Sequence, residues 1–256
     1  MKIYAETCIM CEECFDYCPV GCILVGEESA FIDQDECVEC GVCFRAGVCP
    51  VDAIYVPEES RQYPRLIRAQ FSAPDVQHPK LNQGGRGTEE MKTNDVTGRY
   101  RRGELGMALE FGRPGIGTRI SEIEKVLKVL LSMDVEIEKD NPIFLLLKDE
   151  KTGAMKPEVL QEKVLSAILE FKIKEDLLEY VVTQLKPVLD KVDTVVSWGL
   201  ATRFADDGSI PVRSRLAQIG LPARPNAKIN LGLGRPLIED EGVNNEPFAA
   251  SLRYRR

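Results

Sequence analysis

Nine cysteines crowd into the first fifth of this 256-residue chain, and no other feature limits its structure as strongly. All of them lie between Cys8 and Cys49, and the sequence from Pro50 onward contains none. The chain opens without an apolar signal segment, so we expect a cytoplasmic location, where thiols stay reduced. Disulfides are therefore disfavoured. The pattern instead predicts metal or redox chemistry that is confined to the N-terminal segment.

The cysteines form two copies of one motif. The first copy reads C-x-x-C-x-x-C-x-x-x-C-P and the second reads C-x-x-C-x-x-C-x-x-x-x-x-C-P. Their members are, in order, Cys8, Cys11, Cys14 and Cys18, then Cys37, Cys40, Cys43 and Cys49. Three thiolates at this spacing suit one face of an iron–sulfur cube, while the cysteine before proline serves another cluster. Zinc is the alternative, but its four ligands per site explain neither the third cysteine nor the Cys-Pro pair.

With these motifs, residues 1–57 resemble a bacterial two-cluster ferredoxin. The resemblance implies two [4Fe-4S] clusters with crossed ligation. It assigns the first cluster to Cys8, Cys11, Cys14 and Cys49, and the second cluster to Cys37, Cys40, Cys43 and Cys18. The longer gap between Cys43 and Cys49 departs from the family pattern, which makes Cys49 the least regular ligand. The implied role is one-electron transfer, and no catalytic residue is assigned.

Two further residues could take part in metal chemistry. Cys22 falls where the second copy has Ala53, so we expect a small buried side chain, with a substitute ligand or a redox thiol as the alternatives. His78 is the only histidine, and a single histidine cannot build a histidine-rich metal site. Its polar sequence neighbours predict a surface position.

Charge is distributed very unevenly along the chain. Residues 1–60 contain 13 acidic and 2 basic residues, whereas residues 61–102 contain 9 basic and 4 acidic residues. The acidic head would repel phosphates, so nucleic-acid binding is excluded for it. We expect the basic stretch to lie against the acidic head, the alternative being contact with an anion. An anionic cluster in acidic surroundings favours a low reduction potential. No apolar run approaches the ~20 residues of a membrane span.

The rest of the chain predicts an α+β fold. Alternating apolar residues indicate strands at 105–111, 165–173 and 194–201, and short apolar runs indicate strands at 135–137 and 143–147. Helical spacing indicates helices at 120–133, with a capping box of Ser121 and Glu124, and at 175–192, with a kink at Pro187. This order matches a βαββαβ (split βαβ, ferredoxin-like) domain.

We therefore divide the chain into four parts. They are a two-cluster ferredoxin domain (1–57), a basic extended linker or arm (58–102), the βαββαβ domain (103–202) and a tail containing Gly, Pro and Arg (203–256). The long linker without periodicity is typical of a docking segment.

Two weaker resemblances concern the larger part. The turn Gly112–Gly117 resembles the ligand loop of ACT small-molecule sensors, where helix-start amides beside Arg113 and Arg119 would bind an anion; the alternative is a tight turn that needs glycine. Residues 85–99, 112–115 and 232–236 together resemble the iron–sulfur part of 6-hydroxynicotinate reductase-like proteins. That resemblance implies ferredoxin-linked reduction of an aromatic or N-heterocyclic ring in an anaerobe.

The leading hypothesis is an electron-transfer protein or subunit that relays single electrons through two [4Fe-4S] clusters. Its partners would be a partner oxidoreductase and an electron donor or acceptor protein, in a homo- or hetero-oligomer. The second hypothesis is a reductase in its own right, and the third is a redox or small-ligand sensor that uses an ACT-like domain. An electron-transfer component is favoured over a complete enzyme, because no substrate pocket, flavin site or catalytic motif is recognisable in the sequence.

Overall fold

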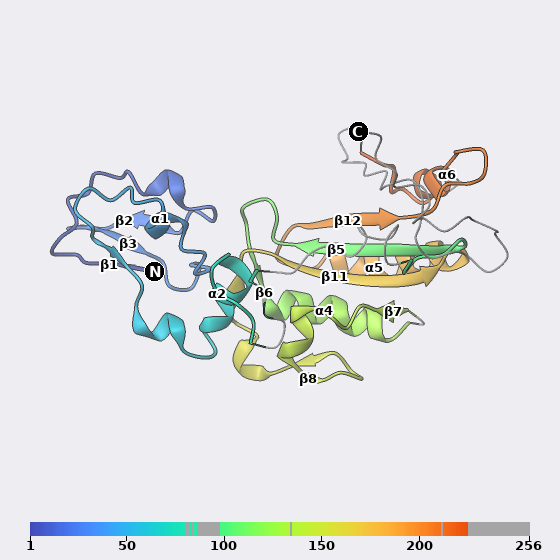
Figure 1. The fold of residues 1–256 in the computed structure, drawn as a ribbon, viewed down its shortest axis with the longest axis horizontal. Coiled ribbons are helices and arrows are strands. Elements are labelled where there is room, and N and C mark those ends of the chain that lie inside the picture. Colours follow the sequence, from blue (N-terminus) through green and yellow to red (C-terminus); the bar gives the residue numbers. More distant parts are fainter. Residues whose placement is uncertain (80–81, 83, 86–97, 134, 211, 225–256) are drawn as a thin grey trace, which may run out of the picture.

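A computed structural model describes the whole chain except residues 80–81, 83, 86–97, 134, 211 and 225–256. A small cysteine-rich head, residues 1–57, lies at one end of the described part. A larger domain with a four-stranded sheet lies at the other end, and a short helix stands between them (Figure 1). Helices and strands both contribute, in agreement with the expected α+β class.

The head consists of short elements held around its cysteines. They are β1 (Lys2–Ile3), the 3-10 turn η1 (Phe15–Tyr17), β2 (Ile23–Val25), β3 (Ala30–Ile32), α1 (Val42–Arg45) and β4 (Ile54–Tyr55). Strand β1 pairs antiparallel with β4, and β2 pairs antiparallel with β3. The apolar centre of the head is small and includes several cysteines, so elements this short depend on what the cysteines bind for much of their stability.

The segment that follows the head is helical where an extended arm was expected. It forms the 3-10 turn η2 (Glu58–Arg61) and helix α2 (Leu66–Ser72). Ile67 and Phe71, one helical turn apart, are both buried in the core of the sheet domain. The prediction of an extended segment is wrong for these residues, because this apolar pair gives the helix a face to bury. Most of 80–97 lies outside the described residues.

The sheet domain is built on two long, paired strands. Strands β5 (Glu104–Phe111) and β11 (Ala167–Lys174) run antiparallel over eight residue pairs, from Phe111 opposite Ala167 to Glu104 opposite Lys174. Strand β12 (Val196–Ala201) pairs with the outer edge of β5, and β7 (Glu136–Ile137) pairs with β11. The sheet order is therefore β12-β5-β11-β7, with antiparallel neighbours throughout.

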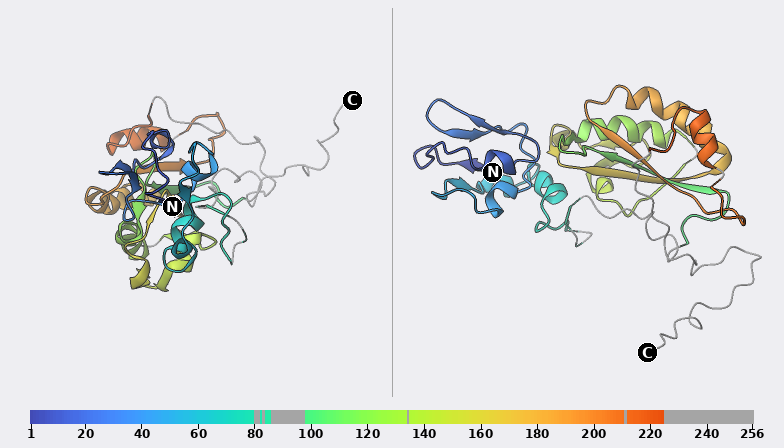
Figure 2. Two further views of the ribbon diagram at one scale, coloured as in Figure 1. Left: turned by 90° about the vertical axis from the view of Figure 1, so that its left-hand side faces the viewer. Right: turned by 90° about the horizontal axis from the view of Figure 1, so that it is seen from above.

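Two amphipathic helices cover one face of this sheet. Helix α4 (Ile120–Leu131) lies beside α5 (Leu178–Leu189) on the same face (Figure 2). Their buried residues recur every three or four positions, as a helix with one apolar stripe requires. The stripe of α4 consists of Ile120, Ile123, Val126, Leu127 and Leu130, and that of α5 consists of Leu178, Val181, Val182 and Leu185. Together with the sheet they form the main core of the molecule.

Smaller elements connect the sheet strands. They are β6 (Thr118–Arg119), the 3-10 turn η4 (Pro142–Leu146), β8 (Leu147–Asp149), β9 (Ala154–Met155), the 3-10 turn η5 (Pro157–Val159), β10 (Lys163–Val164) and the 3-10 turn η6 (Glu175–Leu177). Strand β6 pairs with β10, and β8 pairs with β9.

Two local predictions are wrong. Residues 143–147 were expected to form a strand, but all except Leu147 belong to η4, because the Asn141 side chain accepts a hydrogen bond from the Ile143 amide and Pro142 favours a helical start. The capping box at α4 is absent: Arg119 is the N-cap residue and uses no side-chain cap, while Glu124 accepts from the Met155 amide instead.

After β12 the chain forms helix α6 (Val212–Gln218), with Val212 buried against the main core. The rest of the predicted tail, from residue 225, lies outside the described residues. Among the described helices, none combines the length and apolar character needed to cross a membrane.

Candidate metal centres

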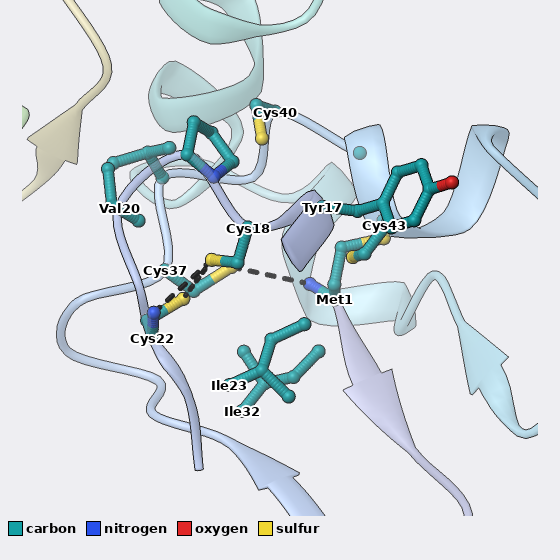
Figure 3. Close-up of a pocket in the computed structure, with 13 residues that line it drawn as sticks. Met1, Tyr17, Cys18, Val20, Cys22, Ile23, Ile32, Cys37, Cys40 and Cys43 are labelled. Atoms are coloured by element: carbon teal, nitrogen blue, oxygen red, sulfur yellow. Dashed lines mark hydrogen bonds between the residues drawn. The ribbon is translucent and has the colours of Figure 1, made fainter. Parts of the chain in front are cut away.

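The eight motif cysteines line two separate cavities in the head. One, which we call the distal cavity because none of its lining residues contacts α2 through a hydrogen bond or ion pair among the described residues, is lined by Cys8, Cys11, Cys14 and Cys49. The other, the proximal cavity, is lined by Cys18, Cys37, Cys40 and Cys43, with Cys22 beside them (Figure 3). Both cavities are small and partly open to solvent. Each cavity takes three cysteines from one motif copy and the fourth from the other copy.

The duplication is visible in the backbone as well as in the cysteine spacing. Met10 and Glu12 have φ values of 52° and 62°, and their counterparts in the second copy, Glu39 and Gly41, have φ values of 54° and 67°. Non-glycine residues in this left-handed region cost about 1–3 kcal/mol each and persist where the surrounding structure holds the backbone in place. The repeated turns wrap the C-x-x-C segments around the cavities in the same way.

The cysteines before the prolines also share a local contact. The Cys22 amide donates to Cys18 Sγ, and the Ala53 amide donates to Cys49 Sγ, each over 3.2 Å. Amide donors to sulfur stabilise a thiolate and tune a bound cluster. The inserted residues before Cys49 therefore leave this amide contact the same as at Cys18.

The cavities suit a cationic group that binds thiolates. Apart from the cysteines, most residues that line them are apolar. Burial and, to a smaller extent, the neighbouring cysteines Cys40, Cys37 and Cys18 together raise the pKa of the Cys43 thiol to about 12. Iron would offset this cost, because a metal ion binds the deprotonated thiol. Four thiols around an apolar space fit a cluster that brings its own sulfide.

Within the described residues, no three His, Cys, Asp or Glu side chains are placed so that they could hold a single metal ion.

Cys22 is buried, as expected, and packs against the cysteines of the proximal cavity. Its Sγ lies 3.5 Å from Cys18 Sγ. The contact with Cys18, together with burial, raises the pKa of Cys22, so this thiol keeps its proton, whereas the same contact lowers the pKa of Cys18. This arrangement fits Cys18 as the ligand and Cys22 as its protonated neighbour.

The wall of the proximal cavity is held by Arg68 of α2. Its buried guanidinium donates to the carbonyl oxygens of Gln34, Asp35 and Cys37, the last over 2.8 Å, and its Nε pairs with Glu162 of the sheet domain. One side chain thus fixes the loop that carries Cys37 and ties that loop to the larger domain.

Three further cations act beside Arg68. Arg65 donates to the buried carboxylate of Glu39 and to Gln34, while Arg119 and Lys163 of the sheet domain both pair with Glu36. The basic stretch that begins at residue 61 therefore lies against the acidic head through Arg65 and Arg68.

Arg65 and Arg68 were not predicted individually from the sequence. The available signal was two arginines three residues apart on an amphipathic segment next to an acidic domain.

His78 was expected on the surface, but it is only 2% exposed. Its ring packs edge-on against Phe71, with the ring centroids 4.9 Å apart, and its Nε2 lies 3.0 Å from the Gly85 carbonyl oxygen. These contacts satisfy an imidazole away from water, so the surface prediction is wrong. Burial lowers the pKa of His78, although the backbone contacts oppose the shift.

The turn Gly112–Gly117 packs against the head near the proximal cavity. A side chain at Gly115 would approach the Pro19 carbonyl oxygen to 2.9 Å, and one at Gly117 would come within 3.4 Å of the Val38 side chain. Gly112, with φ of +86°, would meet the Leu165 carbonyl oxygen at 2.7 Å. Close packing and positive φ thus account for the glycines.

Comparison with known proteins identifies similar sequences for the N-terminal part of the chain. The chain is 45% identical over 67 residues to "Ferredoxin 7Fe" of Hydrogenibacillus schlegelii. The aligned segment makes up 24% of this chain and 83% of that relative. It is 42% identical over 67 residues to a ferredoxin of Streptomyces griseus and 44% identical over 54 residues to Ferredoxin-1 of Caulobacter vibrioides, of which it spans only 62% and 46%.

No family profile and no solved structure matches the chain. The expected resemblance of the remaining residues to 6-hydroxynicotinate reductase-like proteins finds no support in these comparisons.

Proposed function

Because the chain belongs to the ferredoxin family through its N-terminal segment, an iron–sulfur electron-transfer role follows, and we propose that it relays single electrons through two [4Fe-4S] clusters to a partner oxidoreductase. The observation that carries the proposal is the division of eight cysteines into two sets of four around two cavities. In this proposal, Cys8, Cys11, Cys14 and Cys49 hold one cluster, and Cys37, Cys40, Cys43 and Cys18 hold the other.

Bound clusters would supply reversible one-electron chemistry. The chain's own residues position the thiolates, exclude water and set the charge around them. Amide donors at Cys18 and Cys49 stabilise the sulfur charge, and the buried Cys37, Cys40 and Cys43 keep the proximal site dry. Because thiolate ligands must stay reduced, the proposal includes a cytoplasmic location.

The test is a set of serine substitutions in chains purified without oxygen. Cys11→Ser and Cys40→Ser should each lose one cluster, so that iron falls from about eight to about four per chain and the number of electrons accepted in a reductive titration falls from about two to about one. Cys22→Ser is the matched control and should keep both clusters. Loss of iron in Cys22→Ser but not in Cys40→Ser would contradict the proposed ligand set.

The physiological donor and acceptor can be sought in the same preparation. Oxidoreductases that co-elute from cells under anaerobic conditions should be reduced by the reduced chain, with one electron passing per encounter. A reduced chain that passes electrons to none of them would contradict a relay to an oxidoreductase.

A further inference from the structure

The two cavities differ in how the rest of the molecule covers them. Helix α2 and the larger domain contact the loops that line the proximal cavity: Arg68 donates to the Cys37 carbonyl oxygen, and the turn Gly112–Gly117 packs against Pro19 and Val38, which both line this cavity. Cys37, Cys40 and Cys43 are accordingly buried. The sheet domain therefore occupies one side from which a redox partner could approach these thiols.

The cysteines of the distal cavity are less buried than those of the proximal cavity. Cys11 is exposed, and its neighbour Ile9 is 60% exposed, the largest exposed fraction among the large apolar side chains of the described residues. Their loop lies at the end of the head away from the sheet (Figure 2). In the described part of the chain, no hydrogen bond or ion pair joins residues 4–14 to any residue beyond 57.

Carboxylates surround this apolar, cysteine-bearing loop. Glu6, Glu12 and Glu13 are exposed, and none of the ion pairs among the described residues includes them. No lysine or arginine occurs in the sequence between Lys2 and Arg45. The loop therefore has an apolar centre with an acidic rim, which is the usual anatomy of a protein interface. Such a charge distribution attracts a basic surface and repels an acidic one.

We propose that redox partners dock at this distal rim, where Glu6 and Glu13 flank Ile9 and Cys11 in the sequence, and that the partner presents a basic surface around its own redox centre. The proposal rests on the proposed electron-transfer function and adds the side of the chain on which electrons leave it. One electron leaves the reduced chain on the distal side and reduces the partner's centre by one unit, with no bond made or broken. Electrons then enter and leave the proximal site by way of the distal site.

The experiment compares two charge reversals of equal size in the full-length, cluster-loaded chain. Glu6→Lys with Glu13→Lys changes the distal rim, while Glu150→Lys with Asp190→Lys, both exposed on the sheet domain, is the matched control. Each double variant is reduced with dithionite and mixed in a stopped-flow instrument with one of three oxidants. These are ferricytochrome c, a basic haem protein, hexaamminecobalt(III), a small cation, and ferricyanide, a small anion.

At low ionic strength the rim variant should react about tenfold more slowly than the control variant with the two cationic oxidants and faster than the control variant with ferricyanide, because local charge steers encounter. The differences should shrink at high salt as screening sets in. Iron and sulfide contents, measured on the same samples, verify that both variants carry the same clusters. The neutral double variant, Glu6→Gln with Glu13→Gln, should react at an intermediate rate. It replaces the lysine variant in the comparison if the lysine variant does not bind its clusters.

Rates that change equally in the rim and control variants would refute docking on the distal rim while leaving electron transfer by the chain intact. A chain without reducible iron would overturn the proposed function itself, and the docking proposal with it.

Discussion

Arg68 provides the sharpest test of how the head is joined to the larger domain. Its guanidinium is buried and serves three carbonyl oxygens of the loop 34–37 in addition to the carboxylate of Glu162. Arg68→Met keeps the apolar stem but removes every donor. The carboxylate and the carbonyl groups are then left without their partner, which costs about 3–5 kcal/mol when a buried pair is broken on one side.

This loss is large enough to measure directly. With a slope of roughly 3 kcal/mol per molar urea, the unfolding midpoint should fall by about 1–2 M. The midpoint of Arg68→Lys, which restores the charge with a single nitrogen, should lie between that of the parent chain and that of Arg68→Met. The assay is anaerobic urea unfolding followed by far-UV circular dichroism and by the visible absorption of the clusters.

The matched control is Arg61→Met, an exposed arginine on η2. It should leave the midpoint within a few tenths of a molar of the parent value. If Arg68→Met moves the midpoint no further than Arg61→Met does, the contacts of Arg68 do not hold the loop, and the account of the covered proximal cavity is wrong.

Three further predictions concern single residues. Burial lowers the pKa of His78 in the folded chain, so unfolded chains bind the proton first and stability should fall as the pH drops below about 6.5; His78→Gln should flatten this slope between pH 5 and 7 in urea unfolding. Gly112→Ala should cost more than about 2 kcal/mol, whereas Gly208→Ala, with a similar φ but open space around it, should cost about 1 kcal/mol, and equal losses would refute the packing argument. Phe171→Ala, in the fully buried centre of β11, should lower the free energy of unfolding by about 3–5 kcal/mol, while a loss below 1 kcal/mol would contradict the assigned core.

Hydrophobic periodicity predicted the long elements of the larger domain well. The alternation at 105–111 corresponds to β5 (Glu104–Phe111), and the helical spacing at 120–133 corresponds to α4 (Ile120–Leu131). Both elements bury many apolar side chains, so the local pattern and the tertiary structure impose the same requirement. The short apolar run at 143–147 carried no such information, because a run of that length suits a strand or a helical turn equally.

The candidate site shows the same division between local and distant information. Cysteine spacing is local, and it selected the eight residues that line the two cavities. Which cavity is covered depends on contacts between Arg68 and residues more than thirty positions away, and no local pattern encodes them. His78 was misplaced because its polar sequence neighbours do not reveal its contacts with Phe71 and with the Gly85 carbonyl oxygen, each seven positions away.

The most direct test of two [4Fe-4S] clusters is the metal and sulfide content of the full chain purified without oxygen, with electron paramagnetic resonance recorded before and after reduction. The account predicts about eight iron and about eight sulfide per chain, with no signal before reduction and two interacting signals after it. About seven iron, the number in the name of the Hydrogenibacillus schlegelii relative, would contradict the two-[4Fe-4S] count. A colourless chain, or one that holds zinc alone, would contradict the central claim.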